Sequence, residues 1–149
     1  MQIKNIIGVL VGIIGTIITH LFGGWSSTMT TLLILMALDY ITGLIIAGVF
    51  KKSKKSKSGK LSSNECWKGL CKKGVTLCFV LIGHRIDLML GTNYVRDFVT
   101  ISFIVAELIS LVENAGIMGI PIPKVITNVI DILNKKVGET YDTVNKDAG

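Results

Sequence analysis

The sequence is poor in the residue types that build catalytic and metal centres. Its 149 residues include three cysteines and two histidines, and the cysteines have neither CxxC spacing nor a histidine partner. Motifs of serine hydrolases, zinc proteases and phosphate-binding loops are absent. The only candidate constellation, His84-Arg85-x-Asp87, lacks a nucleophile. We therefore expect no enzyme, no metal site and no cofactor.

Charged residues are also few. They make up 17 % of the chain, whereas hydrophobic residues make up 50 %, which leaves a soluble domain too little polar surface to cover its long apolar runs. About 20 apolar residues in a helix cross a hydrocarbon core of about 30 Å. The expected fold is therefore an all-α membrane protein, a bundle of about four transmembrane helices with spans near residues 6–22, 28–50, 74–90 and 98–120.

Shorter elements connect and follow these spans. A turn at residues 23–27 makes the first two spans a helical hairpin. Ser62 has capping-box spacing to Glu65 and opens an interfacial helix that ends at Lys73, before the third span. A model with three spans, in which the first or third run lies at the interface, is the alternative.

The C-terminal part of the chain is amphipathic and then polar. Apolar residues recur at helical spacing over residues 124–136, which predicts an amphipathic helix that does not span the membrane. The membrane domain is expected to cover residues 1–136, and residues 137–149 form a polar tail.

A lysine-rich loop, KKSKKSKSGK at residues 51–60, follows the second span. It lacks the interleaved aromatic residues that stack on bases, so we expect no nucleic-acid partner. Lysines beside a membrane gain about 1 kcal/mol each from anionic lipid, and the positive-inside rule places the loop, and with four spans both termini, in the cytoplasm. The expected contacts with anionic lipid are Lys51, Lys52, Lys54, Lys55, Lys57 and Lys60.

Asp39 is the single charge in the second span, and it lies at the midpoint of that span. An isolated carboxylate at this depth costs about 3 kcal/mol, so it is expected to face protein or water rather than lipid. Thr42, Gly43 and Ala47 share its helix face. This small, polar face predicts either close packing of another helix or the wall of a wet path.

Two further charges are predicted at the same depth. Counted from the inner ends of their spans, Asp39, Arg85 and Glu107 each lie about 16 to 20 Å deep. We expect Arg85 to pair with Asp39 or Glu107, within one subunit or between subunits. Such a pair either fixes helix register or becomes part of a pore wall when subunits assemble. Ser110 belongs to a small, polar stripe on the fourth span and joins the candidate interface.

The first span carries Gly8 and Gly12 in a GxxxG pattern. The pattern favours packing between helix backbones. Glycine is also frequent in membrane helices without that role, so both interpretations stand.

The chain resembles the toxin-secretion/phage-lysis holin family over roughly residues 30–136. The matching residues are Asp39-Tyr40-x-Thr42-Gly43, Leu61-Ser62-Ser63, Gly69-Leu70-x-Lys72-Lys73, Phe103-x3-Glu107-x2-Ser110-x2-Glu113-Asn114 and Gly119-x-Pro121-x-Pro123. The resemblance implies a protein of the bacterial cytoplasmic membrane that forms homo-oligomeric lesions, depolarises the membrane and releases an endolysin or toxin. It implies no direct binding of that cargo. A small secondary transporter, which would use the midplane carboxylates for coupling, and an antiholin-type regulator are the alternatives.

Overall fold

The computed structural model describes residues 2–54 and 58–147, with side chains through residue 139, and every regular element in this part of the chain is helical. The elements are α1 (Gln2–Leu21), α2 (Ser27–Ile45), the π-helical turn η1 (Ile46–Phe50) that continues α2, α3 (Ser63–Leu90), α4 (Val95–Met118) and α5 (Lys124–Asp147). The expected all-α class is confirmed. Two helices, α1 and the continuous segment Ser27–Phe50, are long and apolar enough to cross a membrane.

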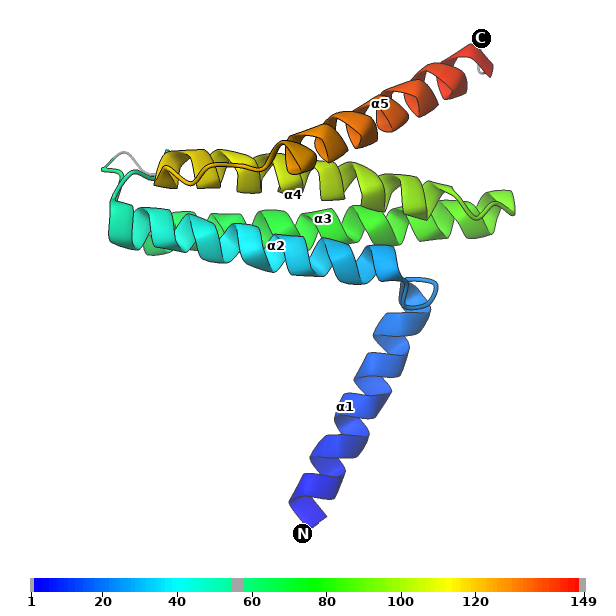
Figure 1. Cartoon of the computed structure of the whole chain (residues 1–149). Coiled ribbons are helices and arrows are strands. Elements are labelled where there is room, and N and C mark those ends of the chain that lie inside the picture. Colours follow the sequence, from blue (N-terminus) through cyan, green and yellow to red (C-terminus); the bar gives the residue numbers. More distant parts are fainter. Residues whose placement is uncertain (1, 55–57, 148–149) are drawn as a thin grey trace.

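Helices α2, α3 and α4 lie side by side and form the body of the molecule (Figure 1). The three helices pack around an apolar core, and each buried side chain of this core is at most 7 % exposed. The core residues are Met29, Leu32, Met36, Val80 and Ile104. Because α2 and α4 both run antiparallel to α3, the lysine-loop end of the bundle holds the C-termini of α2 and α4 and the N-terminus of α3.

Helix α1 projects away from this bundle (Figure 1), and none of its residues is buried. A turn joins the two helices as expected, but α1 does not pack along α2 as it would in a closed hairpin. The connection turns through Gly23 and Gly24, whose φ angles of 74° and 94° are open to glycine and unfavourable for other residues. The Arg96 guanidinium of α4 donates hydrogen bonds to the carbonyl oxygens of Phe22 and Gly23, at 3.1 and 2.9 Å. These bonds fix the end of α1 at the bundle while its apolar length stays outside it.

Helix α3 is continuous over 28 residues, about 42 Å at helical rise. The expected separation into an interfacial helix ending at Lys73 and a span starting at Gly74 is therefore wrong. A single glycine costs a helix only about 1 kcal/mol and does not end it. The helix ends instead at Gly91, which adopts the left-handed conformation with φ 67°. The first turns of α3 pack on α2, where the Tyr40 hydroxyl donates to the carbonyl oxygen of Cys66 at 3.4 Å.

Asp87 fixes the turn between α3 and α4. Its carboxylate accepts hydrogen bonds from the Thr92 hydroxyl at 2.6 Å and from the backbone N–H groups of Val95 and Arg96 at 3.0 and 2.9 Å. The last two are N–H groups of the first turn of α4, which have no partner within their own helix. Asp87 therefore caps α4 from the preceding helix, and its 5 % exposure reflects this role.

Helix α5 runs beside α4 and then diverges from it (Figure 1). It continues to Asp147, so the expected helix end at residue 136 is corrected to a later one. No proline lies beyond Pro123, and Gly138 alone does not stop the helix. Ile130 is buried, whereas Val125 is 71 % exposed. One apolar stripe of α5 is thus covered by the bundle and another is open.

Candidate functional site

Three ionisable side chains from three helices meet between α2, α3 and α4. The Lys73 ammonium lies 3.0 Å from Asp39 Oδ2 and 2.6 Å from Glu107 Oε2. The side chains of Asp39, Lys73 and Glu107 are 7 %, 15 % and 13 % exposed. We call these three residues the ion cluster. One ammonium on α3 therefore joins a carboxylate of α2 to a carboxylate of α4.

Asp39 holds further partners on α4. Its Oδ1 atom accepts a hydrogen bond from the Ser110 hydroxyl at 2.5 Å and one from the Asn114 amide at 3.0 Å. The same amide donates to Thr42 Oγ1 at 2.9 Å, and the Thr42 hydroxyl donates to the Asp39 carbonyl oxygen. Polar side chains facing each other across α2 and α4 thus satisfy the carboxylate that an apolar helix carries at its midpoint.

The ion cluster is electrostatically unequal, because two carboxylates share one ammonium. Burying a charge is costly unless it is paired and hydrogen-bonded. Removing one partner of a buried pair typically costs about 3–5 kcal/mol, because the other charge is left uncompensated. Lys73 is therefore the residue on which both carboxylates depend.

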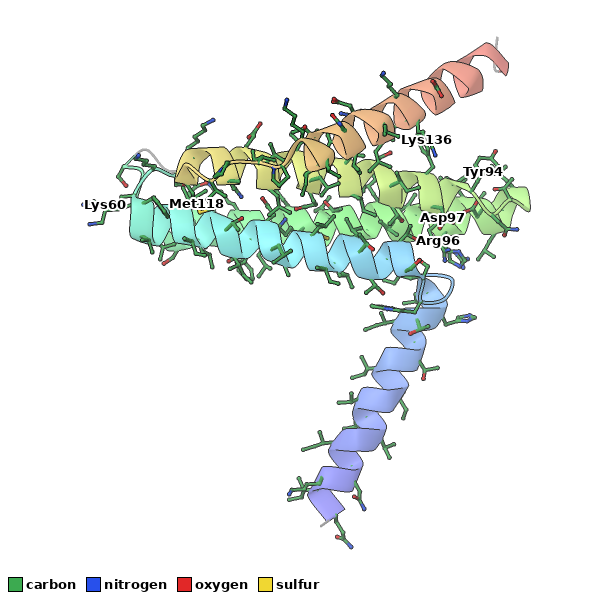
Figure 2. All side chains as sticks on the ribbon, in the orientation of Figure 1. Lys60, Tyr94, Arg96, Asp97, Met118 and Lys136 are labelled. Carbon is green, nitrogen blue, oxygen red and sulfur yellow. The ribbon has the colours of Figure 1, made fainter. Side chains whose placement is uncertain are left out.

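A cavity of about 280 Å³ lies beside the ion cluster, in the lysine-loop half of the bundle. Its walls come from α2 with η1, from α3 and from α4, and the ends of the lysine loop border its mouth. Asp39, Lys73 and Glu107 all line it. Lys60 and Met118 mark this end of the bundle in Figure 2, whereas Tyr94 and Arg96 mark the opposite end. The cavity therefore leads from the lysine-loop end to the ion cluster.

The structure brings together most of the interface residues expected from the sequence. Asp39, Gly43, Ala47, Glu107 and Ser110 all line this cavity. Thr42 stands beside it through its bond with Asn114. Whether these residues form a pore or an oligomer interface remains a prediction.

Arg85 does not join this group. The expected pairing of Arg85 with Asp39 or Glu107 within one subunit is wrong, since Lys73 occupies that place. Arg85 is exposed and makes no ion pair with any described residue. The error follows from the assumed start of the third span, because a helix that begins at Ser63 carries Lys73 to the depth of Asp39.

Sequence reasoning missed Lys73 as a member of the site, whereas Asn114 was expected close to the polar stripe of Ser110. The expected place of Lys73 is the end of an interfacial helix, although no proline or turn signal separates it from the apolar residues that follow. That uninterrupted sequence is the signal for a continuous helix. Asn114 lies four residues after Ser110, so both face the same side of α4.

The remaining predicted residues lie away from the ion cluster. Gly8 and Gly12 have nothing within 4 Å of the place where a Cβ would stand. Among the loop lysines, Lys54 and Lys60 line the mouth of the cavity. The exposed loop lysines are Lys51, Lys52, Lys54 and Lys60. Lys55 and Lys57 lie outside the described residues.

Comparison with known proteins identifies relatives over most of the chain. The model of the bacteriophage holin family matches residues 16–135. An uncharacterized protein of Listeria monocytogenes is 39 % identical over 134 residues, which cover 89 % of this chain and 90 % of the relative. A 14.9 kDa protein of Clostridium perfringens is 36 % identical over 125 residues, covering 83 % and 89 %. A protein of Bacillus phage phi105 named probable holin is 30 % identical over 119 residues, covering 79 % and 82 %. No solved structure matches this chain.

Proposed function

The chain belongs to the bacteriophage holin family, whose members are non-enzymatic membrane proteins, and from this membership and the ion cluster we propose that it acts as a holin. Copies of the protein accumulate in the bacterial cytoplasmic membrane and oligomerise into lesions. The lesions depolarise the membrane and let an endolysin or a toxin leave the cytoplasm, which ends in host lysis for an endolysin. The proposal implies no direct binding between the cargo and the protein.

The observation that carries this proposal is the polar surface between α2 and α4. Asp39 contacts Ser110, Asn114 and Lys73 in the closed bundle, and Lys73 also contacts Glu107. A helix with charged and hydroxyl groups on one face and apolar residues on the other suits a lesion, because the polar face can line water while the apolar face contacts lipid. A fully apolar bundle would offer no such wall.

The proposed topology has four spans. Helices α1 and α2 meet the length and composition of membrane helices. Helices α3 and α4 carry more charge, but Lys73 and Glu107 form an ion pair inside the bundle, and Asp87 lies at the far end of α3 from the lysine loop. The lysine loop then faces the cytoplasm, and both termini lie on the same side. There the loop lysines contact anionic lipid.

Inducible expression in bacteria tests the function. Membrane potential and release of a co-expressed cytoplasmic enzyme are followed together. We expect abrupt depolarisation with release of the enzyme, and Asp39→Asn is expected to change the time of onset because it alters the bonds between α2, α3 and α4. Asp97→Asn is the control, since Asp97 is partly exposed and pairs with its neighbour Arg96.

Two other results would lead to other functions. Saturable transport of a small solute, without release of protein, would support a secondary transporter. Oligomers without depolarisation or release would support an antiholin-type regulator. Either result would contradict the holin proposal.

A further inference from the structure

The cavity and the apolar core divide the bundle into two unequal halves. The half toward the lysine loop holds the 280 Å³ cavity and the ion cluster. The other half contains the apolar core, in which Leu32 and Val80 are fully buried, and a smaller cavity of about 110 Å³ lies beyond that core at the α3–α4 turn. The ion cluster lies at the boundary between the two. A solute that entered from the lysine-loop end would thus meet charge at mid-bundle and apolar packing beyond it.

The contents of the cavity wall determine what fills it. Much of the wall is apolar, but ionisable groups from the loop, α2, α3 and α4 also line it: Lys54, Lys60, Glu65, Lys72 and Glu113, in addition to the ion cluster. Empty cavities in proteins are apolar, whereas polar ones hold water, which occupies about 30 Å³ per molecule. A volume of about 280 Å³ is sufficient for several water molecules. Lys73 and Glu107, whose side chains remain 15 % and 13 % exposed, both line this space.

We propose that this cavity is a water-filled vestibule that admits small hydrophilic molecules from the lysine-loop side of the membrane and ends at the ion cluster. The closed protomer then already contains one half of an aqueous path, and the apolar core of α2, α3 and α4 closes the other half. This inference rests on the proposed function only where it says that a lesion extends the vestibule into a complete aqueous path. The vestibule itself is a property of one protomer and is measured without lysis.

Thiol modification in sealed membrane vesicles tests the vestibule. The starting protein carries Cys66→Ser, Cys71→Ser and Cys78→Ser, and single cysteines are then introduced. Ser110→Cys reads the floor of the cavity, and Ser102→Cys is the matched control. Both serines lie on α4, eight residues apart, and Ser102 does not line the cavity. Ser58→Cys marks the lysine-loop side and Asn93→Cys marks the opposite side, since both positions are exposed.

The probe is a membrane-impermeant trimethylammonium methanethiosulfonate, which converts an accessible thiolate into a mixed disulfide and releases a sulfinate. Vesicles are used in which Asn93→Cys is protected while Ser58→Cys is modified. We expect Ser110→Cys to react from the Ser58 side about tenfold or more faster than Ser102→Cys, because the reaction requires water and the thiolate form. From the Asn93 side neither is expected to react.

Ser110→Cys removes the hydrogen bond from Ser110 to Asp39, so a second variant is needed that leaves this bond in place. It retains the native Cys66, which lines the cavity, and carries only the Cys71 and Cys78 replacements. The vestibule is overturned if both Cys66 and Ser110→Cys stay unmodified from the Ser58 side, or if Ser110→Cys reacts first from the Asn93 side. A protein with an accessible Ser110→Cys that releases no enzyme in cells would refute the holin proposal and leave the vestibule standing.

Discussion

Helices α1 and α2 are both apolar enough to span a membrane, yet they have opposite relations to the rest of the molecule. Helix α1 has no buried residue and projects from the bundle, whereas α2 buries Met29, Leu32, Met36 and Asp39. The difference is one charge and its partners. A helix of hydrophobic residues alone has no preference for protein over lipid, whereas a carboxylate at its midpoint must find donors, and α3 and α4 supply them. The region matched by the family model begins at residue 16, so it includes the whole bundle but leaves out most of α1.

The largest effect is expected from removing the Lys73 ammonium, because it holds the charged residue that distinguishes α2 from α1. In Lys73→Met the carboxylates of Asp39 and Glu107 lose the cation that joins them. We expect the bundle to lose about 3–5 kcal/mol of stability, measured by thermal or SDS unfolding in detergent. Lys72→Met is the control, because Lys72 is exposed and makes no ion pair with a described residue. Equal stability of the two variants would contradict the role given to Lys73.

Truncation of an apolar side chain compares α1 and α2 directly. Leu32 is fully buried, whereas Leu10 is 53 % exposed. Leu32→Ala is expected to cost about 2–3 kcal/mol, because it removes buried contacts and leaves a cavity. Leu10→Ala is expected to change the stability of the bundle by less than about 0.5 kcal/mol. Unfolding in detergent, followed by circular dichroism, measures both, and a large loss in Leu10→Ala would show that α1 is part of the cooperative unit.

The cap between α3 and α4 sharpens the comparison at the other end of the bundle. Asp87→Asn replaces one carboxylate oxygen with an amide that cannot accept from the α4 backbone. We expect a loss of about 1–2 kcal/mol, as for other helix caps. Asp97→Asn serves as the control, since its side chain is 45 % exposed and bonds to Arg96 beside it. Amide hydrogen exchange at Val95 and Arg96 should accelerate only in the Asp87 variant, and unchanged exchange there would rule out the cap.

The smallest effect is expected at the glycines of α1. Nothing lies within 4 Å of a Cβ placed at Gly8 or Gly12, so we expect the double substitution to leucine to be accommodated without a clash. Stability of the bundle is expected to change by no more than about 0.5 kcal/mol. Cross-linking in membranes then reports separately on any packing between copies. A marked destabilisation of the monomer would mean that α1 packs on the bundle after all.

The sequence alone was sufficient to predict the helical class and the central position of Asp39, because both depend on local signals. An apolar run of this length predicts a helix, and a lone charge at its midpoint predicts that polar or charged side chains contact it. The identity of those partners depended on where α3 begins. Gly74 was interpreted as a boundary, which placed Arg85 at the depth that Lys73 occupies. The wrong start of α3 therefore led to the prediction of Arg85 as the partner of Asp39 in place of Lys73.

The direction of α1 could not be predicted for a different reason. The turn depends on the positive φ angles of Gly23 and Gly24 and on the bonds from Arg96 to the carbonyl oxygens of Phe22 and Gly23. These bonds join residues more than 70 positions apart in the chain. The glycines indicated a turn but not its angle. The capping role of Asp87 was missed similarly, because its partners lie beyond the end of its own helix.

The sharing of one ammonium by two carboxylates also constrains how this protein can evolve. A substitution that removes the charge of Lys73 leaves two anions facing each other, whereas loss of one carboxylate leaves a neutral pair. Neutral drift should therefore pass through the carboxylate positions before it reaches position 73, and descendants without a cation at position 73 should lack an acid at position 39, at position 107 or at both. Reconstructed intermediates that follow this order should be more stable to unfolding than those that reverse it.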